Sequence, residues 1–341
     1  MTYYPFKMDV NYFNRIGVIS MQNSLTAGSR IIILLIIGIL FSASVIALSV
    51  CRRDPAVYKS SHLFRESKKI EQKYLVKCGG KLIIDAEVGS ISVTGTEREE
   101  AAIVVYARGD EDDLERFDVK MEQSGNDVKI KALFSGNSFR WFNFSNLDIL
   151  FEIEVPEKYN LDLETAGGNI EVKNIEGHVE GETSGGNLIL EDLIADVILS
   201  TSGGNVEIRN ASGDFRLETS GGNMFAQAVT GPLYMETSGG SIDIRDCDGK
   251  IYGSTSGGNI KAYLKSNEGI NLSTSGGNIY VRLPSSITAN VYAETSGGDV
   301  NCELEFSGKL KDGSMKGKIN GGGKEIQLET SGGNITITSY D

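Results

Sequence analysis

The sequence has few of the residues on which most enzyme and metal chemistry depends. Only 2 histidines and 4 cysteines occur among 341 residues, and the cysteines show no C-x-x-C spacing, which argues against a zinc site. Proline is also scarce, at 5 residues, and charged residues make up 23% of the chain. This composition fits an all-β repeat protein better than a disordered chain. The net charge of −13 disfavours binding to nucleic-acid phosphates.

One phrase, Thr-Ser-Gly-Gly-Asn followed by an aliphatic residue, recurs through the second half of the chain. Self-similarity at a fixed short period is typical of stacked repeat architectures. The first five steps between phrases are 18 residues each, and the later steps are 19, 21 and 35. The phrase or a variant of it begins at Thr165, Thr183, Thr201, Thr219, Thr237, Thr255, Thr274, Thr295 and Thr330.

Apolar and polar residues alternate within each repeat, which is the pattern of half-buried strands. Numbered from the threonine, positions six and eight are apolar, as in Ile170 and Val172, and so are positions fifteen and seventeen, as in Val197 and Leu199. The change from even to odd positions places the threonine inward and the following serine outward. Glycine at position thirteen and the Gly-Gly pair mark two corners. The pattern predicts an all-β fold, a single-stranded β-solenoid (β-helix) with about 18 residues per coil.

The asparagine of the repeated phrase predicts a ladder of stacked side chains along one corner of the solenoid. We expect amide side chains to bond from coil to coil, with interruptions where Ser241 and Asp299 replace asparagine. A corner-forming role is favoured over a ligand site repeated on every coil. The ladder residues are Asn169, Asn187, Asn205, Asn223, Asn259 and Asn278.

A run of twenty uncharged, largely apolar residues, 31–50, is the one clear membrane element in the sequence. A helix of that length is about 30 Å long and can cross a bilayer core. It either stays as a transmembrane anchor or is a signal helix that is cleaved. Lipidation at Cys51 is a further alternative, because residues 48–51 loosely resemble a lipoprotein processing box. Residues 1–30 are weakly patterned, and a start at Met21 would leave an ordinary signal n-region.

Two opposing signals bear on the side of the membrane where the repeats lie. Basic residues just after the 31–50 run outnumber those just before it, which favours a cytoplasmic repeat region. A short segment in front of a signal-like run favours export, and large domains cross membranes largely regardless of charge. We expect a membrane-anchored protein whose solenoid is periplasmic or extracellular.

The rest of the chain divides into three parts by its pattern. A polar juxtamembrane stalk is expected at 51–73, an N-terminal β cap with the first coils at 74–160, and the regular solenoid at 161–341. An atypical first part is expected, because terminal coils must cover the open end of a solenoid. Residues 320–323 supply a degenerate corner within the 35-residue step, so we expect the coils to continue through it.

Several stretches taken together resemble a known family. With the membrane-anchored N-terminus, the combination resembles the bacterial putative-adhesin family, a β-solenoid domain of unknown function, over residues 75–341. The resemblance implies a right-handed β-helix at the cell envelope, with a role in adhesion or envelope-stress sensing. It supplies no functional residues. The stretches are Gly89-Ser90-Ile91-Ser92-Val93, the Thr-Ser-Gly-Gly-Asn-Ile phrases, Ile319-Asn320-Gly321-Gly322-Gly323 and Leu328-Glu329-Thr330-Ser331-Gly332-Gly333.

Aromatic residues are the candidates for ligand binding. Tyr234, Tyr252 and Tyr280 fall at outward strand positions, and Trp141 and Phe142 lie in an aromatic loop. They favour a non-catalytic binding or scaffold module that recognises an envelope protein or a polysaccharide. We expect no cofactor and no nucleic-acid partner, and contact with the membrane through the apolar run described above. The alternative is a membrane-tethered scaffold that faces the cytoplasm in an envelope-stress response.

A carbohydrate-active enzyme is the catalytic alternative, and it would need clustered carboxylates with a basic residue or a metal. The dense candidate is Asp243, Arg245, Asp246 and Asp248, at a strand end and a turn where charged residues are ordinary. We interpret His178 as a surface residue. Cys247 and Cys302 are expected in the core, and a column of glutamates before the threonines is expected to be a solvated edge without calcium.

Overall fold

The computed structural model of the protein describes residues 66–135 and 147–341. Twenty-six strands and one short helix, α2 (Glu111–Arg116), make up the regular structure of these residues. No helix among them is long and apolar enough to span a bilayer. The predictions made for the 31–50 run, Cys51, Trp141 and Phe142 lie outside the described residues.

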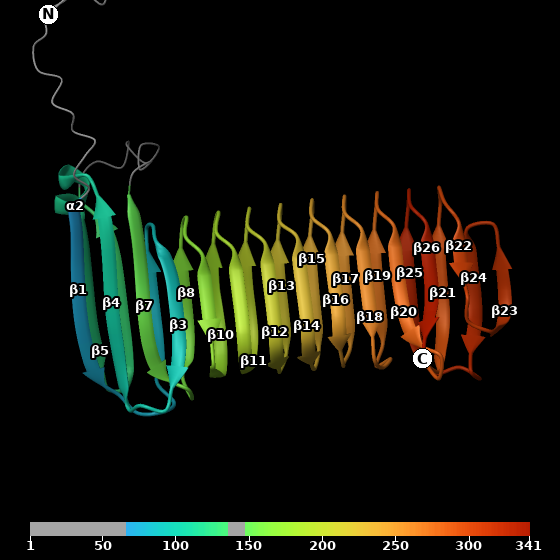
Figure 1. Ribbon diagram of the computed structural model, residues 1–341, viewed down its shortest axis with the longest axis horizontal. Coiled ribbons are helices and arrows are strands. Elements are labelled where there is room, and N and C mark those ends of the chain that lie inside the picture. The colour runs from blue at the N-terminus through green and yellow to red at the C-terminus, as the bar shows by residue number, and fades with distance from the viewer. Residues whose placement is uncertain (1–65, 136–146) are drawn as a thin grey trace, which may run out of the picture. The chain divides into compact units, whose positions relative to one another are not determined.

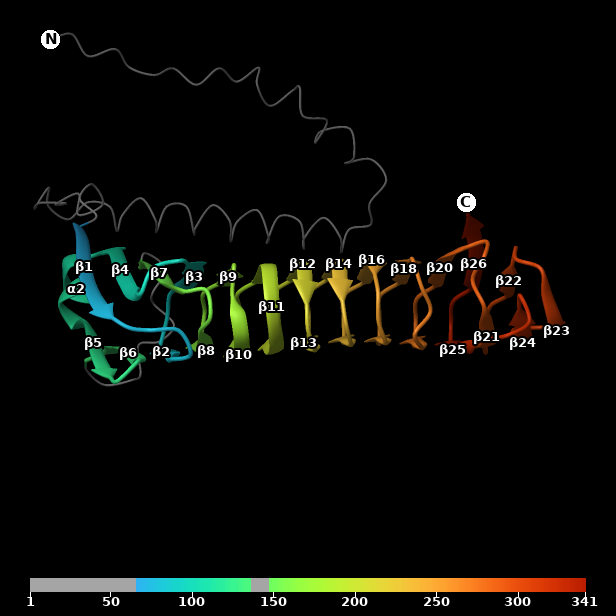
Figure 2. The ribbon, with the colours of Figure 1, turned by 90° about the horizontal axis from the view of Figure 1, so that it is seen from below.

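Each repeat contributes one strand to each of two facing walls, which appear as two layers in Figure 2. Strands of successive repeats lie side by side, parallel and in register, so that Leu188 pairs with Val206 and Val206 with Met224. Paired residues in these coils are therefore 18 positions apart, which is the period of the repeated phrase. The prediction of an all-β, β-solenoid-like repeat fold is confirmed.

The two walls extend from β1 and β5 at one end of the stack to β22 and β23 at the other (Figure 1). The long strand β11 passes from the first wall to the second. In spatial order the first wall consists of β1 (Glu66–Leu75), β4 (Glu100–Gly109), β7 (Asp148–Pro156), β3 (Ser90–Thr96), β9 (Ile170–Lys173), the start of β11 (Leu188–Thr201), β12 (Val206–Ser212), β14 (Met224–Thr230), β16 (Ile242–Cys247), β18 (Ile260–Leu264), β20 (Ile279–Pro284), β26 (Ile335–Tyr340) and β22 (Val300–Cys302). The second wall consists of β5 (Phe117–Ser124), β6 (Asp127–Phe134), β2 (Lys81–Ala86), β8 (Asn160–Thr165), β10 (Glu176–Thr183), the end of β11, β13 (Phe215–Thr219), β15 (Leu233–Thr237), β17 (Ile251–Thr255), β19 (Ile270–Thr274), β25 (Lys324–Thr330), β21 (Ala289–Thr295), β24 (Ser314–Ile319) and β23 (Phe306–Lys311).

The inward-facing residues of both walls form one continuous core. Positions six, eight and fifteen are buried as predicted, except for the half-buried Cys302 at position eight, and Ile170, Val172 and Val197 are at most 1% exposed. Position eleven also points inward. The residue before it has a left-handed backbone, with φ between 52° and 56°, in the five coils that carry Asn174, Asp192, Asn210, Ala228 and Asp246 there. Asparagine and aspartate tolerate this conformation better than most residues, which explains their recurrence at the bend.

The threonine that opens each phrase is buried and joins its coil to the neighbouring one. Thr219 is 6% exposed, and its Oγ1 donates a 2.8 Å hydrogen bond to the carbonyl oxygen of Gly204 in the neighbouring coil. Oγ1 of Thr219 also accepts a 3.3 Å hydrogen bond from the backbone N–H of Gly222. Every buried side-chain N or O atom in the described residues has a partner, so these hydroxyls avoid the penalty of unmade bonds. Equivalent bonds to a glycine carbonyl are donated by Thr165, Thr183, Thr201, Thr237, Thr255, Thr274, Thr295 and Thr330.

The second glycine of the phrase is required because the backbones of neighbouring coils approach closely there. A Cβ atom on Gly222 would lie 1.9 Å from the carbonyl oxygen of Gly204, and one on Gly240 would lie 1.8 Å from that of Gly222. The first glycine has more room, since a Cβ on Gly221 would lie 3.7 Å from its nearest neighbours. Only the second glycine is therefore fixed by the spacing of the coils.

The asparagine ladder is present, but the predicted bond between side-chain amides occurs only from Asn278 to Asn259, at 3.3 Å, among the described residues. The Oδ1 atom of Asn205 accepts a 2.8 Å hydrogen bond from the backbone N–H of Asn223 in the next coil. Ser241 continues the ladder, because its Oγ accepts a 3.1 Å bond from the backbone N–H of Asn259. Asp299 also joins, as a backbone donor to Oδ1 of Asn334. The predicted interruption at Ser241 was wrong, because its hydroxyl supplies the one acceptor atom per coil that the ladder needs, whereas Asp299 joins through its backbone alone.

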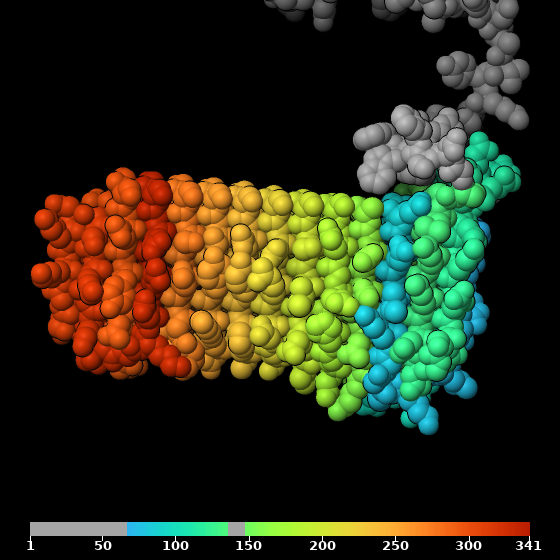
Figure 3. Space-filling view, turned by 180° about the vertical axis from the view of Figure 1, so that it is seen from behind, coloured from blue at the N-terminus to red at the C-terminus, as the bar shows by residue number. Residues whose placement is uncertain are grey.

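At the N-terminal end of the stack, spatial order departs from chain order. β2 lies between β6 and β8, and Figure 3 shows it as a cyan band between greener neighbours. The outer strands are antiparallel, and β1 begins at Glu66, inside the stretch predicted as a stalk. Its lysines hide the alternating pattern, in which Ile70 and Tyr74 pack against the core.

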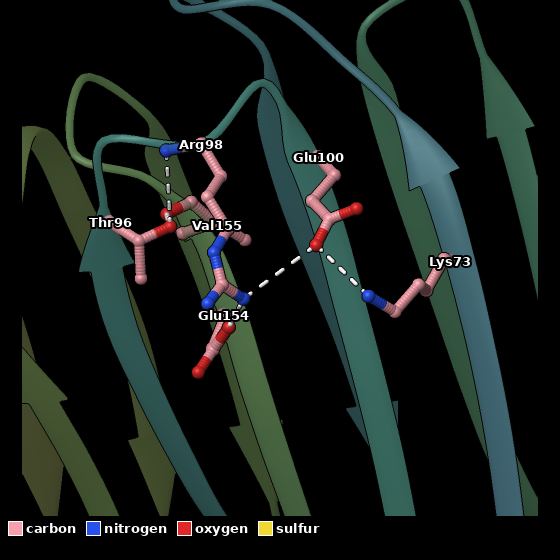
Figure 4. Close-up of polar contacts among 6 residues, drawn as sticks. All are labelled: Lys73, Thr96, Arg98, Glu100, Glu154 and Val155. Atoms are coloured by element: carbon pink, nitrogen blue, oxygen red, sulfur yellow. Dashed lines mark hydrogen bonds and ion pairs between the residues drawn. The ribbon is translucent and has the colours of Figure 1, made fainter.

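Exposed ion pairs cross the outer strands of the first wall (Figure 4). Lys73 of β1 lies 3.0 Å from Glu100 of β4, and Arg98 lies 2.8 Å from Glu154 of β7. Surface ion pairs of this kind contribute little to stability. The packing of the inward residues therefore sets the register of these strands, and the ion pairs only accompany it.

At the other end, the coil formed by β25 and β26 lies inside the stack. It pairs with β19 and β20 on one side and with β21 and β22 on the other, although it follows all four in sequence. β25 is the darker red stripe between more orange neighbours in Figure 3. The expectation that residues 320–323 form a corner of a continuing coil was wrong, because the residues before them form the antiparallel hairpin of β23 and β24. Asn320, with φ 48°, and the positive-φ Gly321 and Gly322 turn the chain back into the stack.

We expect Gly222→Ala to lower the free energy of unfolding by more than about 3 kcal/mol, because the new methyl group would overlap a backbone carbonyl. Gly221→Ala, one residue away, should change it by less than about 0.5 kcal/mol. Urea denaturation of both variants beside the wild type measures the difference. Equal losses would contradict the explanation by close approach.

Thr219→Val keeps the shape of the side chain but removes the hydroxyl that joins two coils. We expect a loss of about 1–3 kcal/mol, because one carbonyl and one N–H would be buried without their partner. Thr219→Ser, which keeps the hydroxyl, should lose about 0.8 kcal/mol for the missing methyl. A valine variant as stable as the wild type in the same denaturation assay would show that the hydroxyl does not hold the coils.

Candidate binding site

Outward side chains form columns because the coils stack in register. Neighbouring strands of a wall are about 4.8 Å apart, so side chains at one repeat position contact each other along the stack. Positions seven and nine face outward from the first wall, and positions sixteen and eighteen face outward from the second. The chemistry of each surface follows from what successive repeats place at these positions.

Tyr234 and Tyr252 lie together on the second wall, as two rings of one column. Their ring centroids are 4.5 Å apart and their planes differ by 3°. The guanidinium of Arg216, on the strand at the other side, lies 4.3 Å from the Tyr234 centroid. The Tyr234 hydroxyl donates a hydrogen bond to Glu236, and this bond, with burial, raises the pKa of Tyr234 to about 12. Both faces of the Tyr234 ring are thus covered by its own neighbours.

Tyr280 lies apart from this pair, in a groove on the first wall. β18 and β20 place Lys261 beside Tyr280 and Tyr263 beside Arg282. Cationic and aromatic side chains therefore alternate both along the strands and across them, and we call these four residues the checkerboard. Tyr263 and Tyr280 are 37% and 40% exposed. The groove has a volume of about 480 Å³, and it is also lined by Asn259, Val281, Thr336 and Thr338.

The two flanks of the checkerboard differ. On one side, Tyr280 and Arg282 pair with the shorter Thr336 and Thr338 of β26, and these small side chains open the groove. On the other side, Asp243 neighbours Lys261. Asp243 is already held by two hydrogen bonds from Arg245, of 2.9 and 2.7 Å.

The cations of the checkerboard are left without a carboxylate partner. No ion pair between described residues includes Lys261 or Arg282, although nearby basic residues such as Arg209, Arg245 and Lys265 are paired. The guanidinium of Arg282 lies 5.6 Å from the ring centroid of Tyr340. Both positive charges are therefore available to a ligand in the groove.

The candidate catalytic cluster is held by its own partners. Asp243 binds Arg245, Asp246 lies 3.6 Å from Lys265, and Asp248 accepts a 2.5 Å hydrogen bond from Ser266. Asp246 occupies the left-handed bend of its coil. Within residues 66–135 and 147–341, no group of three or more His, Cys, Asp or Glu side chains is arranged to hold a metal ion.

The cysteines and the histidine occupy ordinary positions. Cys247 is buried, and burial raises the pKa of its thiol to about 11. Cys302 is half-buried, and both thiols are free. The strands that carry them are separated by β18, β20 and β26, one coil more than the sequence suggests, because of the inserted coil. His178 lies half-exposed on β10, 3.8 Å from Glu180.

Sequence reasoning identified one of the four checkerboard residues and missed three. The signal was available, because Lys261 and Tyr263 occupy the same repeat positions as Tyr280 and Arg282 one coil later. Reading outward positions in pairs of adjacent coils would have found them. A second missed feature is the basic hairpin, which we define as the four outward lysines of β23 and β24. These are Lys309, Lys311, Lys316 and Lys318.

The chain matches a family model and is similar to several solved structures. The Toastrack DUF4097 model matches residues 81–338, and no curated protein matches the chain. A putative cell adhesion protein from Clostridium sporogenes is 17% identical, with 80% of this chain and 100% of that chain covered and a TM-score of 0.25. A putative adhesin from Bacteroides fragilis is 16% identical (80% and 97% covered, TM-score 0.38), and a putative lipid binding protein from Parabacteroides distasonis is 13% identical (82% and 98% covered, TM-score 0.32). The family match spans both walls and nearly all of the repeats, and the chain belongs to the Toastrack DUF4097 family.

Proposed function

We propose that this protein is a non-catalytic binding module of the cell envelope, a membrane-anchored β-solenoid that recognises a polysaccharide or a protein partner. The checkerboard groove is the observation that supports this most. Two aromatic and two cationic side chains are exposed together on strands that are hydrogen-bonded on both sides. Binding there requires little ordering of the backbone, which favours affinity. The partnered carboxylates of the 243–248 cluster also favour binding over catalysis.

We further propose that residues 31–50 anchor the protein as a transmembrane helix or signal anchor, with the solenoid outside the cytoplasm. The support is the length and apolar composition of this run. Cys51 is the alternative anchor through lipidation, and Trp141 and Phe142 are proposed to add contacts to a partner. The second candidate function is a cytoplasm-facing scaffold in an envelope-stress response, which the basic residues after the run favour.

Protease shaving of intact cells tests the side on which the solenoid lies. The cells carry the full chain with a C-terminal tag, and the outer permeability barrier is opened without lysis. We expect the tag to be lost, because the solenoid is proposed to lie outside the cytoplasm. A cytoplasmic protein in the same cells serves as the lysis control. A tag that stays protected until lysis would contradict the proposal and support the cytoplasm-facing scaffold.

Retention of envelope material tests the binding function. The full chain, immobilised in detergent through its tag, is incubated with solubilised envelope polysaccharide and protein. We expect the wild type to retain material, and Tyr263→Ala/Tyr280→Ala to lose most of it, because the aromatic half of the groove is gone. Tyr292→Ala is the matched control, since Tyr292 is 38% exposed but lies on the second wall. No retention by the wild type would refute the binding function, and equal losses in both variants would refute the assigned groove.

A further inference from the structure

We infer that the checkerboard groove binds a glycan through a sugar that bears a carboxylate. The inference rests on the proposed function and names the ligand class of the same groove. It depends on four observations: two unpaired cations, two exposed tyrosines, polar side chains at the rim, and the spacing of the coils.

The positive charges of Lys261 and Arg282 favour an anionic ligand. Acidic residues outnumber basic ones by 46 to 33 in this chain, and several cations close to the groove pair with a carboxylate, as Arg245 does with Asp243. Lys261 and Arg282 form no ion pair with a described residue, and Asp243, the carboxylate beside Lys261, is held by Arg245. Arginine binds a carboxylate through two parallel hydrogen bonds, and lysine adds a mobile point charge. A carboxylate that enters the groove between them gains both interactions.

The tyrosines and the rim select a sugar over a small inorganic anion. A tyrosine presents an apolar ring with a polar hydroxyl at its end, which suits a pyranose whose C–H face is apolar and whose edge carries hydroxyls. Thr336 and Thr338 line the groove with hydroxyls that both donate and accept hydrogen bonds, and Asn259 adds its amide NH₂ group, since its Oδ1 already accepts bonds from Asn278. A ligand rich in hydroxyls satisfies these groups, whereas an apolar ligand would leave them unpaired.

The spacing of the coils lets one sugar contact a tyrosine ring and a cation at the same time. Lys261 and Tyr280 are paired across adjacent strands, as are Tyr263 and Arg282. Each cation therefore lies on the strand next to that of a tyrosine, and neighbouring strands are about 4.8 Å apart. A sugar that packs on either tyrosine therefore holds its ring carboxylate within reach of the cation beside it. The diagonal arrangement lets two successive sugars bind in the same way.

The charge of the whole chain limits how densely charged the ligand is. The net charge of −13 repels a continuous polyanion such as a nucleic acid at long range. A glycan with a carboxylate on only some of its sugars avoids most of this repulsion. A neutral glycan, in contrast, would cover Lys261 and Arg282 without pairing them, which costs free energy. The sparsely carboxylated glycan satisfies both limits.

Calorimetric titration with defined trisaccharides tests the inference. The full chain in detergent is titrated at low ionic strength with a trisaccharide that contains a single glucuronic acid, with the methyl ester of that trisaccharide and with a single-stranded oligonucleotide of equal charge. We expect the acid to bind, and the ester and the oligonucleotide to bind about tenfold more weakly or not at all, which corresponds to the loss of one charge-assisted hydrogen bond. Lys261→Gln/Arg282→Gln should weaken binding of the acid by a similar factor.

Lys316→Gln/Lys318→Gln is the matched control, because it removes two charges from the basic hairpin on the second wall. We expect this variant to bind the acid like the wild type. Equal binding of acid and ester, equal losses in the two double variants, or no binding of the acid by the wild type would overturn the inference. If Lys261→Gln/Arg282→Gln still retains envelope material as the wild type does, the carboxylated-sugar inference fails while the proposed binding function stands. If the wild type retains no envelope material, the proposed function itself fails.

Discussion

A buried hydroxyl holds each coil of this protein to the next. The threonine that opens every phrase donates to a glycine carbonyl in the neighbouring coil, and that glycine has no room for a side chain. The asparagine ladder adds a second link at the same corner. All three features require the same short distance between coils, so they select one register and exclude the others. The straight walls and the columns on them are consequences of that single spacing.

Regular columns explain why a groove can arise from a repeat without any change in the backbone. Inward positions vary little, because each must fill the same core. Outward positions vary freely, and only the side chains decide what a wall presents. Tyr234 is covered on both faces by Arg216 and Tyr252, so its contacts are internal to the wall. Two coils further along, the same architecture leaves Tyr280 open, because β26 places only threonines beside it.

The sequence predicted the coil but not the order in which all coils stack. The 18-residue period and the alternation of apolar residues identify the inward columns, since burial imposes both directly. The place of the Thr330 coil could not be read in this way, because every coil carries the same phrase and any two of them match equally well. The checkerboard was not predicted, for a related reason. Nothing in the sequence around Lys261 and Arg282 marks them, and only the register of β18 and β20 shows that they lie close together.

The insertion of β25 and β26 between earlier coils has a consequence for synthesis. The coil of β21 and β22 leaves the ribosome before the coil that must lie between it and β19. Until residues 324–340 are made, β19 and β20 present open parallel edges, and β21 can pair only with its antiparallel partner β24. The rest of the repeats can fold in the order in which they are synthesised, but β21 and β22 cannot take their final place until β25 and β26 have been made. The edges of β19 and β20 stay unpaired until then, and strands of other chains can pair with them before residues 324–340 do so.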